Sequence, residues 1–256
     1  MAASTLPGAE GFELGDGPVG ALLVHGFSSS PQTMRGLGEH LAARGVRVSA
    51  PLLPGHGTDV YDFAKRRPEE WVAAVREAYE ALAERCDPVF VVGVSFGSAL
   101  AVDLAADLGD KAAGLVLLAS VVEVEAMKRA ALWLIRWFVP TVKGVGNDIS
   151  EPSLRCEVGY DRLPTGVTYR MARWLTGLPG RMEEVRAPAL IMHGRHDHEA
   201  PAANPRLLHE RLGSLRKELV WLERSWHVIT LDVEREAVYA RVGDFVSSLS
   251  SGSGGA

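Results

Sequence analysis

Short apolar runs alternate with longer amphipathic stretches along most of the chain. The apolar runs are rich in Val, Leu, Ala and Ile and have the length of buried strands; they cover residues 21–24, 46–50, 89–94, 114–119, 189–193 and 218–222. Most of the stretches between them have helical periodicity. This order predicts the α/β class, with a mostly parallel central sheet covered by helices on both faces.

Punctuating residues set the expected helix boundaries. Ser30 and Pro31 predict the start of one helix, and Gly45 lies just past its end. Pro68 opens another helix, and Asp232 is expected to start the last one. The helix after Pro68 has one apolar face, made by Trp71, Ala74, Val75, Ala78 and Leu82.

Residues 121–186 interrupt this alternation. The stretch carries a cluster of large apolar side chains, namely Trp133, Leu134, Ile135, Trp137, Phe138 and Trp174, followed by loops rich in Gly and Asp. We interpret it as a mostly helical cap inserted after the fourth strand; the alternative is an ordinary pair of core helices. The core domain then comprises residues 1–120 and 187–249, and residues 250–256 are expected to form a flexible Gly/Ser tail.

Composition and charge exclude several classes of protein. A chain of 256 residues with a net charge of −5 and mixed signs does not have the surface of a nucleic-acid-binding protein. Cys86 and Cys156 are too few for a disulfide framework, and the N-terminal residues lack the pattern of a signal peptide, so a cytoplasmic protein is expected. The apolar stretch 130–139 contains Arg136 and is shorter than the roughly 20 residues of a membrane span, although it could contact lipid.

The segment Gly93-Val94-Ser95-Phe96-Gly97 follows a predicted strand and precedes a predicted helix. A nucleophilic serine on such a turn needs glycine on both sides, because a Cβ atom there would collide with the neighbouring strand or helix. Ser95 is therefore the candidate nucleophile.

The acid and the base of a catalytic triad are expected after later strands. Asp197 follows the strand that ends at His193, and His227 follows the strand that ends at Leu222. The order Ser, Asp, His is the one that accompanies Gly-x-Ser-x-Gly in an open α/β sheet. Glu199 is a second carboxylate close to Asp197 in the sequence.

Two backbone N–H groups are expected to form an oxyanion hole. One is normally on the residue after the nucleophile, which is Phe96. The second should follow an early central strand, and we assign it to Phe27 in His25-Gly26-Phe27. His25 and His56 are interpreted as structural residues that hold loops beneath the site.

A metal centre is the alternative interpretation of the histidine-rich loop after the fifth predicted strand. His193, His196, Asp197 and His198 lie close together there. Their spacing matches no standard zinc motif, and a hydrolytic zinc site needs ligands from elsewhere as well. We therefore expect no metal and no organic cofactor.

The motifs together resemble the α/β-hydrolase family, in particular its small bacterial carboxylesterases and monoacylglycerol lipases. The matching segments are Leu22-Leu23-Val24-His25-Gly26-Phe27 with Ser28-Ser29-Ser30-Pro31, Pro54-Gly55-His56-Gly57, the Ser95 turn, Met192-His193-Gly194-Arg195-His196-Asp197 and Ser225-Trp226-His227. They span roughly residues 15–250. The resemblance implies ester hydrolysis through an acyl-enzyme, with Ser95, Asp197 and His227 as the triad and the Phe27 and Phe96 amides as the oxyanion hole.

Aromatic residues near the expected site favour a substrate with an apolar acyl chain. Phe27, Phe96, Trp133, Trp137, Phe138 and Trp226 are the candidate substrate-binding residues. We expect short- to medium-chain acyl esters, with monoacylglycerol as the physiological candidate by resemblance. The same triad could instead cleave an amide, a thioester or a carbon–carbon bond, and a non-catalytic ligand-binding protein is a further alternative. The sequence gives no oligomeric state.

Overall fold

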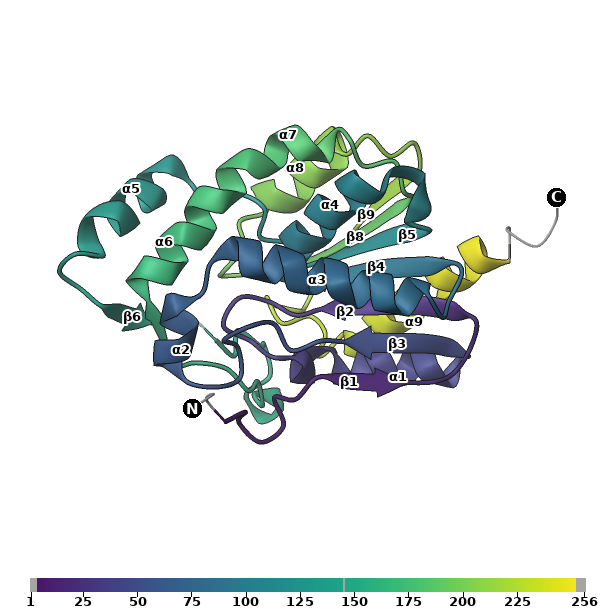
Figure 1. The fold of residues 1–256 in the computed structure, drawn as a ribbon, viewed down its shortest axis with the longest axis horizontal. Helices are drawn as coiled ribbons and strands as arrows, with labels where there is room; N and C mark the ends of the chain where they lie inside the picture. The colour runs from purple at the N-terminus through teal and green to yellow at the C-terminus, as the bar shows by residue number, and fades with distance from the viewer. Residues whose placement is uncertain (1–3, 145, 252–256) are drawn as a thin grey trace.

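The computed structural model describes residues 4–144 and 146–251. Seven strands form one sheet, in the order β1-β3-β2-β4-β5-β8-β9 (Figure 1). Their bounds in that spatial order are Phe12–Leu14, Val46–Ala50, Val19–Val24, Val89–Val94, Gly114–Leu118, Ala189–Gly194 and Lys217–Leu222. All neighbours are parallel except β1, which pairs antiparallel with β3. The predicted mostly parallel sheet is confirmed.

Each of the six predicted strands is present, and its bounds differ by at most two residues from the prediction. Strand β1 was not predicted. Its Phe12, Glu13 and Leu14 are all partly or fully exposed, so the run carries no buried apolar pattern. It pairs with β3 at the edge of the sheet through backbone hydrogen bonds. Such bonds do not depend on particular side chains, so the sequence pattern does not predict them.

Helices cover both faces of the sheet. One face packs against α1 (Arg35–Ala43) and α9 (Arg235–Ser250), and the other against α3 (Pro68–Ala83), α4 (Phe96–Leu108) and α8 (Ala203–Arg211) (Figure 1). The short helix α2 (Val60–Lys65) precedes α3. Short 3-10 turns lie at Pro31–Met34, Gly109–Lys111, Pro152–Leu154 and Leu175–Gly177.

Two predicted helix starts differ from the structure. Ser30 precedes the 3-10 turn that leads into α1, but its hydroxyl donates to the carbonyl of Val158 instead of capping the turn. Helix α9 begins at Arg235, three residues after Asp232. The Asp232 carboxylate instead accepts from Ser150 and from the backbone N–H of Trp226, so a distant segment takes up its acceptors. Residues 252–256 of the expected tail lie outside the described residues, and Ser250 is the last residue of α9.

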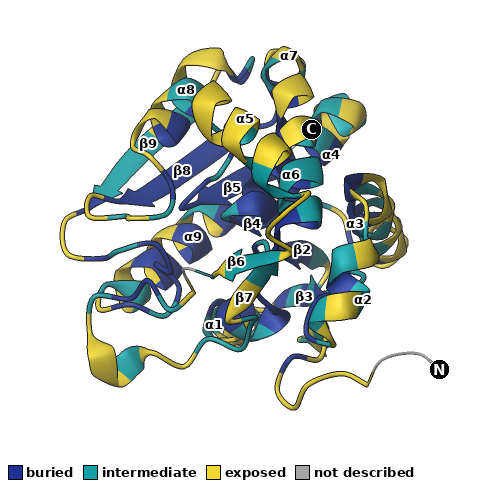
Figure 2. Cartoon of the chain, turned by 90° about the vertical axis from the view of Figure 1, so that its left-hand side faces the viewer, coloured by how far each residue is buried: buried dark blue, intermediate teal, exposed yellow. Residues whose placement is uncertain are grey.

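The segment between β5 and β8 contains both helices and strands. Its helices are α5 (Ala126–Ile135), α6 (Thr165–Trp174) and α7 (Leu178–Met182), and its strands β6 (Thr141–Lys143) and β7 (Arg162–Pro164) form an antiparallel pair that was not predicted. Helices α6 and α7 bury side chains in the same core as α3 and α4. Helix α5 buries none and projects from the body (Figures 1 and 2). The division into core and cap stays an interpretation. Helix α5 fits a cap best, because it buries no side chain, whereas α6 and α7 pack into the core.

A helix that crosses a membrane must be apolar over roughly 20 residues. No helix within residues 4–144 and 146–251 meets that requirement of length and hydropathy.

Candidate active site

Ser95 lies on a strained turn between β4 and α4. Its φ of 55° and ψ of −122° fall in a region that side-chain-bearing residues rarely adopt. A Cβ atom on Gly93 would lie 2.3 Å from the carbonyl oxygen of Gly97, and one on Gly97 would lie 2.2 Å from that of Val24. Both glycines are therefore required by close backbone approach, as the motif suggested.

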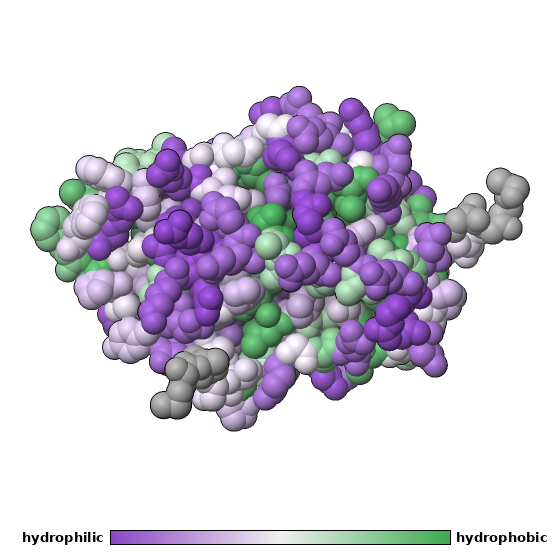
Figure 3. All heavy atoms as spheres, viewed as in Figure 1, coloured by the Kyte–Doolittle hydropathy of each residue, from purple (hydrophilic) through white to green (hydrophobic). Residues whose placement is uncertain are grey.

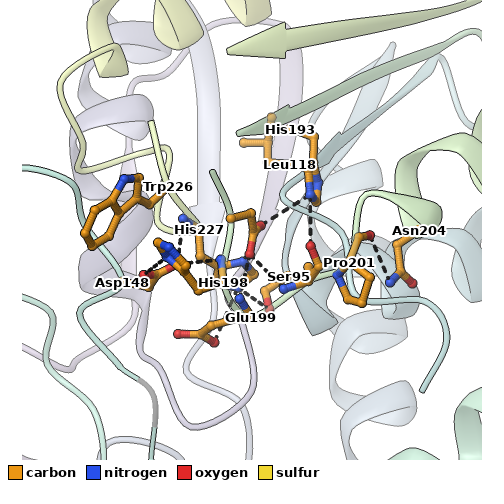
Figure 4. Close-up of polar contacts among 12 residues, drawn as sticks. Ser95, Leu118, Asp148, His193, His198, Glu199, Pro201, Asn204, Trp226 and His227 are labelled. Atoms are coloured by element: carbon orange, nitrogen blue, oxygen red, sulfur yellow. Dashed lines mark hydrogen bonds and ion pairs between the residues drawn. The ribbon is translucent and has the colours of Figure 1, made fainter. Parts of the chain in front are cut away.

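A chain of hydrogen bonds joins the three predicted triad side chains (Figure 4). The distance from His227 Nε2 to Ser95 Oγ is 2.9 Å, and that from His227 Nδ1 to Asp197 Oδ2 is 2.7 Å. The residues come from loops after β4, β8 and β9, which are parallel strands whose carboxyl ends meet at one edge of the sheet. Ser95 and His227, which are 132 positions apart in the sequence, are thus in direct contact.

The Asp197 carboxylate is buried and fully engaged. Its Oδ1 accepts from the backbone N–H groups of Glu199 at 2.9 Å and Ala200 at 2.7 Å. Burial raises the pKa of Asp197, but the charge and hydrogen bond of His227, together with His193 and the backbone donors, outweigh it and leave the pKa below its usual value. An ionised Asp197 fixes the His227 tautomer that presents Nε2 to the serine.

His227 is buried beside two carboxylates. Burial lowers its pKa, but the charges of Asp197 and Glu199 outweigh this and raise the pKa from 6.5 to about 9. Glu199 Oε2 lies 3.7 Å from His227 Nε2. Burial is also the main reason why the pKa of Glu199 is raised. The Nε2 atom is therefore approached by both Ser95 and a carboxylate.

The loop that carries His227 is held by residues that sequence reasoning missed. Asp148 Oδ2 accepts the backbone N–H of His227 at 3.2 Å and that of His198 at 3.1 Å, and Asp148 Oδ1 lies 2.8 Å from His198 Nδ1. Asp232 accepts the N–H of Trp226 at 2.8 Å and also binds Ser150. Asp148 and Ser150 belong to the segment between β5 and β8, in a Gly/Asp-rich loop without a recognisable motif, so only the folded chain could identify them.

The predicted oxyanion-hole residues border the site. Phe96 is the first residue of α4, and the first N–H groups of a helix have no intrahelical acceptor. Gly26 and Phe27 line the same cavity as Ser95. His25 holds this loop in place, because its Nε2 accepts the N–H of Leu53 at 3.1 Å and its Nδ1 lies 2.9 Å from the carbonyl oxygen of Gly26. Burial lowers the pKa of His25 to about 4, so the ring is neutral.

A cavity of about 370 Å³ opens above Ser95. Ser95, Phe27, Phe96 and His227 lie in its wall. Its other apolar lining residues are Val94, Val121, Val124, Leu163, Met171 and Val228. Its polar lining residues include Ser28, Ser29, Thr33, Lys128, Glu157, Thr168, His198 and Glu199. The wall is thus divided between an apolar and a polar part, and the segment between β5 and β8 contributes to both.

The structure does not bring four of the predicted substrate-binding residues to this cavity. Trp133, Trp137 and Phe138 lie on or just after α5 with their side chains in solvent, and Phe138 is 80% exposed. Trp226 precedes His227 but packs against His198, with ring centroids 4.6 Å apart. Smaller apolar residues such as Val121, Leu163 and Met171 occupy the wall instead. The aromatic residues were predicted because large apolar side chains are typical of binding sites. In the sequence, the aliphatic lining residues cannot be distinguished from ordinary core residues.

His193, near the end of β8, and His198, in the loop after β8, face different partners. His193 Nε2 faces the carbonyl oxygen of Ala200 at 3.2 Å, and His198 Nδ1 faces Asp148 (Figure 4). Within the described ranges 4–144 and 146–251, no group of three or more His, Cys, Asp or Glu side chains is arranged to hold a metal ion.

Comparison with known sequences shows extended similarity to bacterial enzymes. A protein family described as serine aminopeptidase, S33, matches residues 20–234. The chain is 35% identical over 243 residues to a thermostable monoacylglycerol lipase of Bacillus sp. (strain H-257), covering 94% of this chain and 95% of that protein. It is 26% identical over 242 residues to a carboxylesterase of Bacillus subtilis (strain 168), covering 93% and 96% of the two chains.

Solved structures agree with this placement. A structure from work on LipS and LipT, two metagenome-derived lipolytic enzymes, has a TM-score of 0.92 and 34% sequence identity, and the match covers 96% of this chain and 100% of the other. The monoacylglycerol lipase of Paleococcus ferrophilus shares the fold, with a TM-score of 0.77 at 20% identity over 93% of this chain and 98% of that one. The chain therefore belongs to the α/β-hydrolase family, within which it is a serine hydrolase of the carboxylesterase and monoacylglycerol lipase type.

Proposed function

We propose that this chain hydrolyses short- to medium-chain acyl esters through an acyl-enzyme on Ser95, with monoacylglycerols as natural substrates. The observation that carries the proposal is the hydrogen-bonded chain from Ser95 through His227 to Asp197 at the wall of a cavity. The monoacylglycerol assignment rests on the Bacillus relative of 35% identity. A cavity of about 370 Å³ is near the lower end of the range for small-molecule sites, which favours a modest acyl chain with a small alcohol.

His227 takes the proton of Ser95 as Oγ attacks the ester carbonyl, and Asp197 stabilises the imidazolium that forms. The N–H groups of Phe27 and Phe96 donate to the developing oxyanion, each such donor being worth on the order of 10² to 10³ in rate. Nε2 then returns the proton to the leaving alcohol. A water molecule, deprotonated by the same nitrogen, attacks the acyl-enzyme and releases the acid.

A lipid surface is the proposed source of substrate. Apolar side chains are exposed around α5, where Figure 3 shows hydrophobic residues at one end of the molecule; they are Met127, Trp133, Leu134, Trp137, Phe138 and Val139. Lys128 of the same helix lines the cavity, so this surface lies beside the entrance. Such an exposed apolar patch is typical of a surface that contacts a membrane or another apolar phase.

Steady-state hydrolysis of p-nitrophenyl esters from acetate to palmitate, and of a monoacylglycerol, tests the proposal. The native chain should turn over the shorter esters, and Ser95→Ala should abolish the activity. Ser248→Ala, an exposed serine on α9, is the matched control and should remain active. Because the matching family is described as a serine aminopeptidase, an aminoacyl p-nitroanilide belongs in the panel. Preferential turnover of the anilide, or no turnover of any ester, would contradict the proposal.

A further inference from the structure

Glu199 places a carboxylate beside the catalytic nitrogen. Its Oε2 lies 3.7 Å from His227 Nε2, beyond hydrogen-bond distance but close enough for a small group to contact both atoms. The side chain lines the cavity. The backbone N–H of Glu199 donates to Asp197 Oδ1, which fixes the position of the residue next to the triad.

The proton transfer by His227 indicates which part of the substrate lies next to Glu199. The leaving oxygen must come within about 3 Å of Nε2 to receive its proton. A carboxylate 3.7 Å from the same nitrogen therefore borders the alcohol part of the substrate, rather than the far end of the acyl chain. The attacking water occupies the same region in the second half of the reaction.

The cationic groups of the cavity already face other carboxylates. When His227 is protonated, its ring lies closer to Asp197, with Nδ1 2.7 Å from Asp197 Oδ2, than to Glu199. Among the described residues that line the cavity, Lys128 is the only Lys or Arg, and its ammonium group already lies 3.1 Å from Glu125 Oε1. Glu157 adds a second carboxylate to the cavity wall. An anionic leaving group would therefore meet like charge at short range, in surroundings where water screens poorly.

We propose that Glu199 is a specificity-determining residue for the leaving group, which excludes esters whose alcohol carries a negative charge and favours neutral, hydroxyl-bearing alcohols. This inference rests on the proposed ester hydrolysis and adds the chemistry of its alcohol side. The carboxylate of Glu199 accepts a hydrogen bond from a hydroxyl group of the alcohol but repels a carboxylate or phosphate placed there.

Two esters of the same acyl chain test this proposal, because their leaving groups are similar in size and differ in charge. They are 2-hydroxyethyl butyrate and carboxymethyl butyrate. The native chain should prefer the neutral ester, and Glu199→Gln should lower the ratio of the two kcat/KM values about tenfold. Glu199→Asp keeps the charge and should retain most of the preference.

Glu157→Gln is the matched control. It removes a charge from the same cavity, but the Glu157 carboxylate already accepts the backbone N–H of Asn147 at 2.8 Å, so this variant should lower the ratio less than Glu199→Gln does. A ratio that is unchanged in Glu199→Gln, or that falls equally in Glu157→Gln, would overturn the assignment to Glu199 while leaving ester hydrolysis intact. A native chain that hydrolyses no ester would overturn both proposals.

Discussion

The carboxylate of Asp148 accepts the backbone N–H of His227 at 3.2 Å, although the two residues are 79 positions apart. Asp148 is buried and lies in the segment between β5 and β8. It therefore connects that segment to the loop on which the catalytic imidazole depends.

Replacing Asp148 should affect catalysis more than substrate binding. Asp148→Ala leaves the buried N–H of His227 and the partly buried N–H of His198 without an acceptor, which should cost about 1–3 kcal/mol in the free energy of unfolding. A His227 that is less well placed should lower kcat about tenfold with little change in KM. Asp148→Asn keeps an acceptor oxygen and should lose less. Urea unfolding and steady-state kinetics measure both effects; an Asp148→Ala protein with full kcat would contradict the positioning role.

Replacing Ser95 should separate activity from backbone strain. Both Ser95→Ala and Ser95→Gly should lose at least about 10⁴ in kcat, because neither has a nucleophile. Glycine tolerates the φ of 55° and ψ of −122°, so Ser95→Gly should be about 1 kcal/mol more stable than Ser95→Ala. Thermal unfolding of the two variants side by side checks this order. Equal stability would mean that the turn is unstrained.

Activity should rise with pH into the alkaline range. Only neutral His227 accepts the serine proton, and its pKa is raised to about 9, so kcat/KM should increase until the pH passes about 9. The charged and titratable groups that face this site are Asp197, Glu199, Glu157, Asp148, His198 and Lys128. Glu199→Gln removes one negative charge and should move this rise to lower pH. A rise complete by about pH 7 in the native chain would contradict the raised pKa.

The raised pKa of His227 should make the folded protein less stable as the pH rises, whereas activity increases over the same range. A group whose pKa is higher in the folded than in the unfolded chain stabilises the fold below its unfolded pKa. For His227 the contribution is complete below pH 6.5 and is lost as the pH rises through about 9. The pH dependence of the unfolding midpoint, compared between the native chain and His227→Gln, measures this contribution. The two curves should converge at high pH, and parallel curves would argue against it.

The apolar residues around α5 should matter only at a lipid surface. Trp137 and Phe138 are 69% and 80% exposed, so replacing both with Ser should change stability by less than about 0.5 kcal/mol. Activity on a dissolved ester should be unchanged, whereas activity on monoacylglycerol in vesicles should fall. Leu215→Ser is the control, because Leu215 is fully exposed just before β9, at the opposite end of the sheet. A higher KM for the dissolved ester would instead support the original acyl-pocket role of the tryptophan.

The close contact beneath Ser95 should make Gly97 intolerant of any side chain. A Cβ atom there would lie 2.2 Å from the carbonyl oxygen of Val24 and 2.6 Å from that of His25. Gly97→Ala should therefore destabilise the protein by about 3 kcal/mol or more. Gly177→Ala meets no atom within 4 Å and should be neutral, which makes it the control in chemical unfolding. Similar stabilities for the two variants would contradict the tight packing.

The sequence predicted the sheet well because its buried parallel strands are either continuous apolar runs, as in 89–94, or alternate buried apolar with partly exposed polar residues, as in 46–50. The predicted ranges 46–50 and 89–94 coincide with β3 and β4. The exposed edge strand β1 and the pair β6–β7 carry no such pattern, since backbone hydrogen bonds hold them. Asp232 illustrates a different failure: an Asp before a helix is a usual start signal, but here the carboxylate binds Ser150 from another part of the chain.

For the candidate site, the residues that carry motif signals lie together, and Phe27 and Phe96 also line the cavity as predicted, whereas its aliphatic lining residues had no signal. Ser95, Asp197 and His227 each follow a predicted parallel strand. Because the carboxyl ends of such strands lie at the same edge of the sheet, their hydrogen-bonded contact could be expected from the sequence. Met171 and Leu163 line the cavity because of how the inserted segment folds back over it. Asp148 could not be recognised because its function depends on a backbone N–H group, which every residue except proline has.

The two hydrogen-bonded links from Asp148 and Ser150 to the His227 loop set a limit on redesign of this enzyme. Exchanging the whole segment between β5 and β8 for that of a relative would transfer a new cavity wall, but it would also replace the stretch that holds the two anchors of the catalytic loop. A chimera that grafts only α5 and the turns beside it, and keeps the stretch around Asp148 and Ser150, would change the entrance while the catalytic loop stays anchored. The useful boundary for engineering therefore lies inside the insertion, not at its two ends.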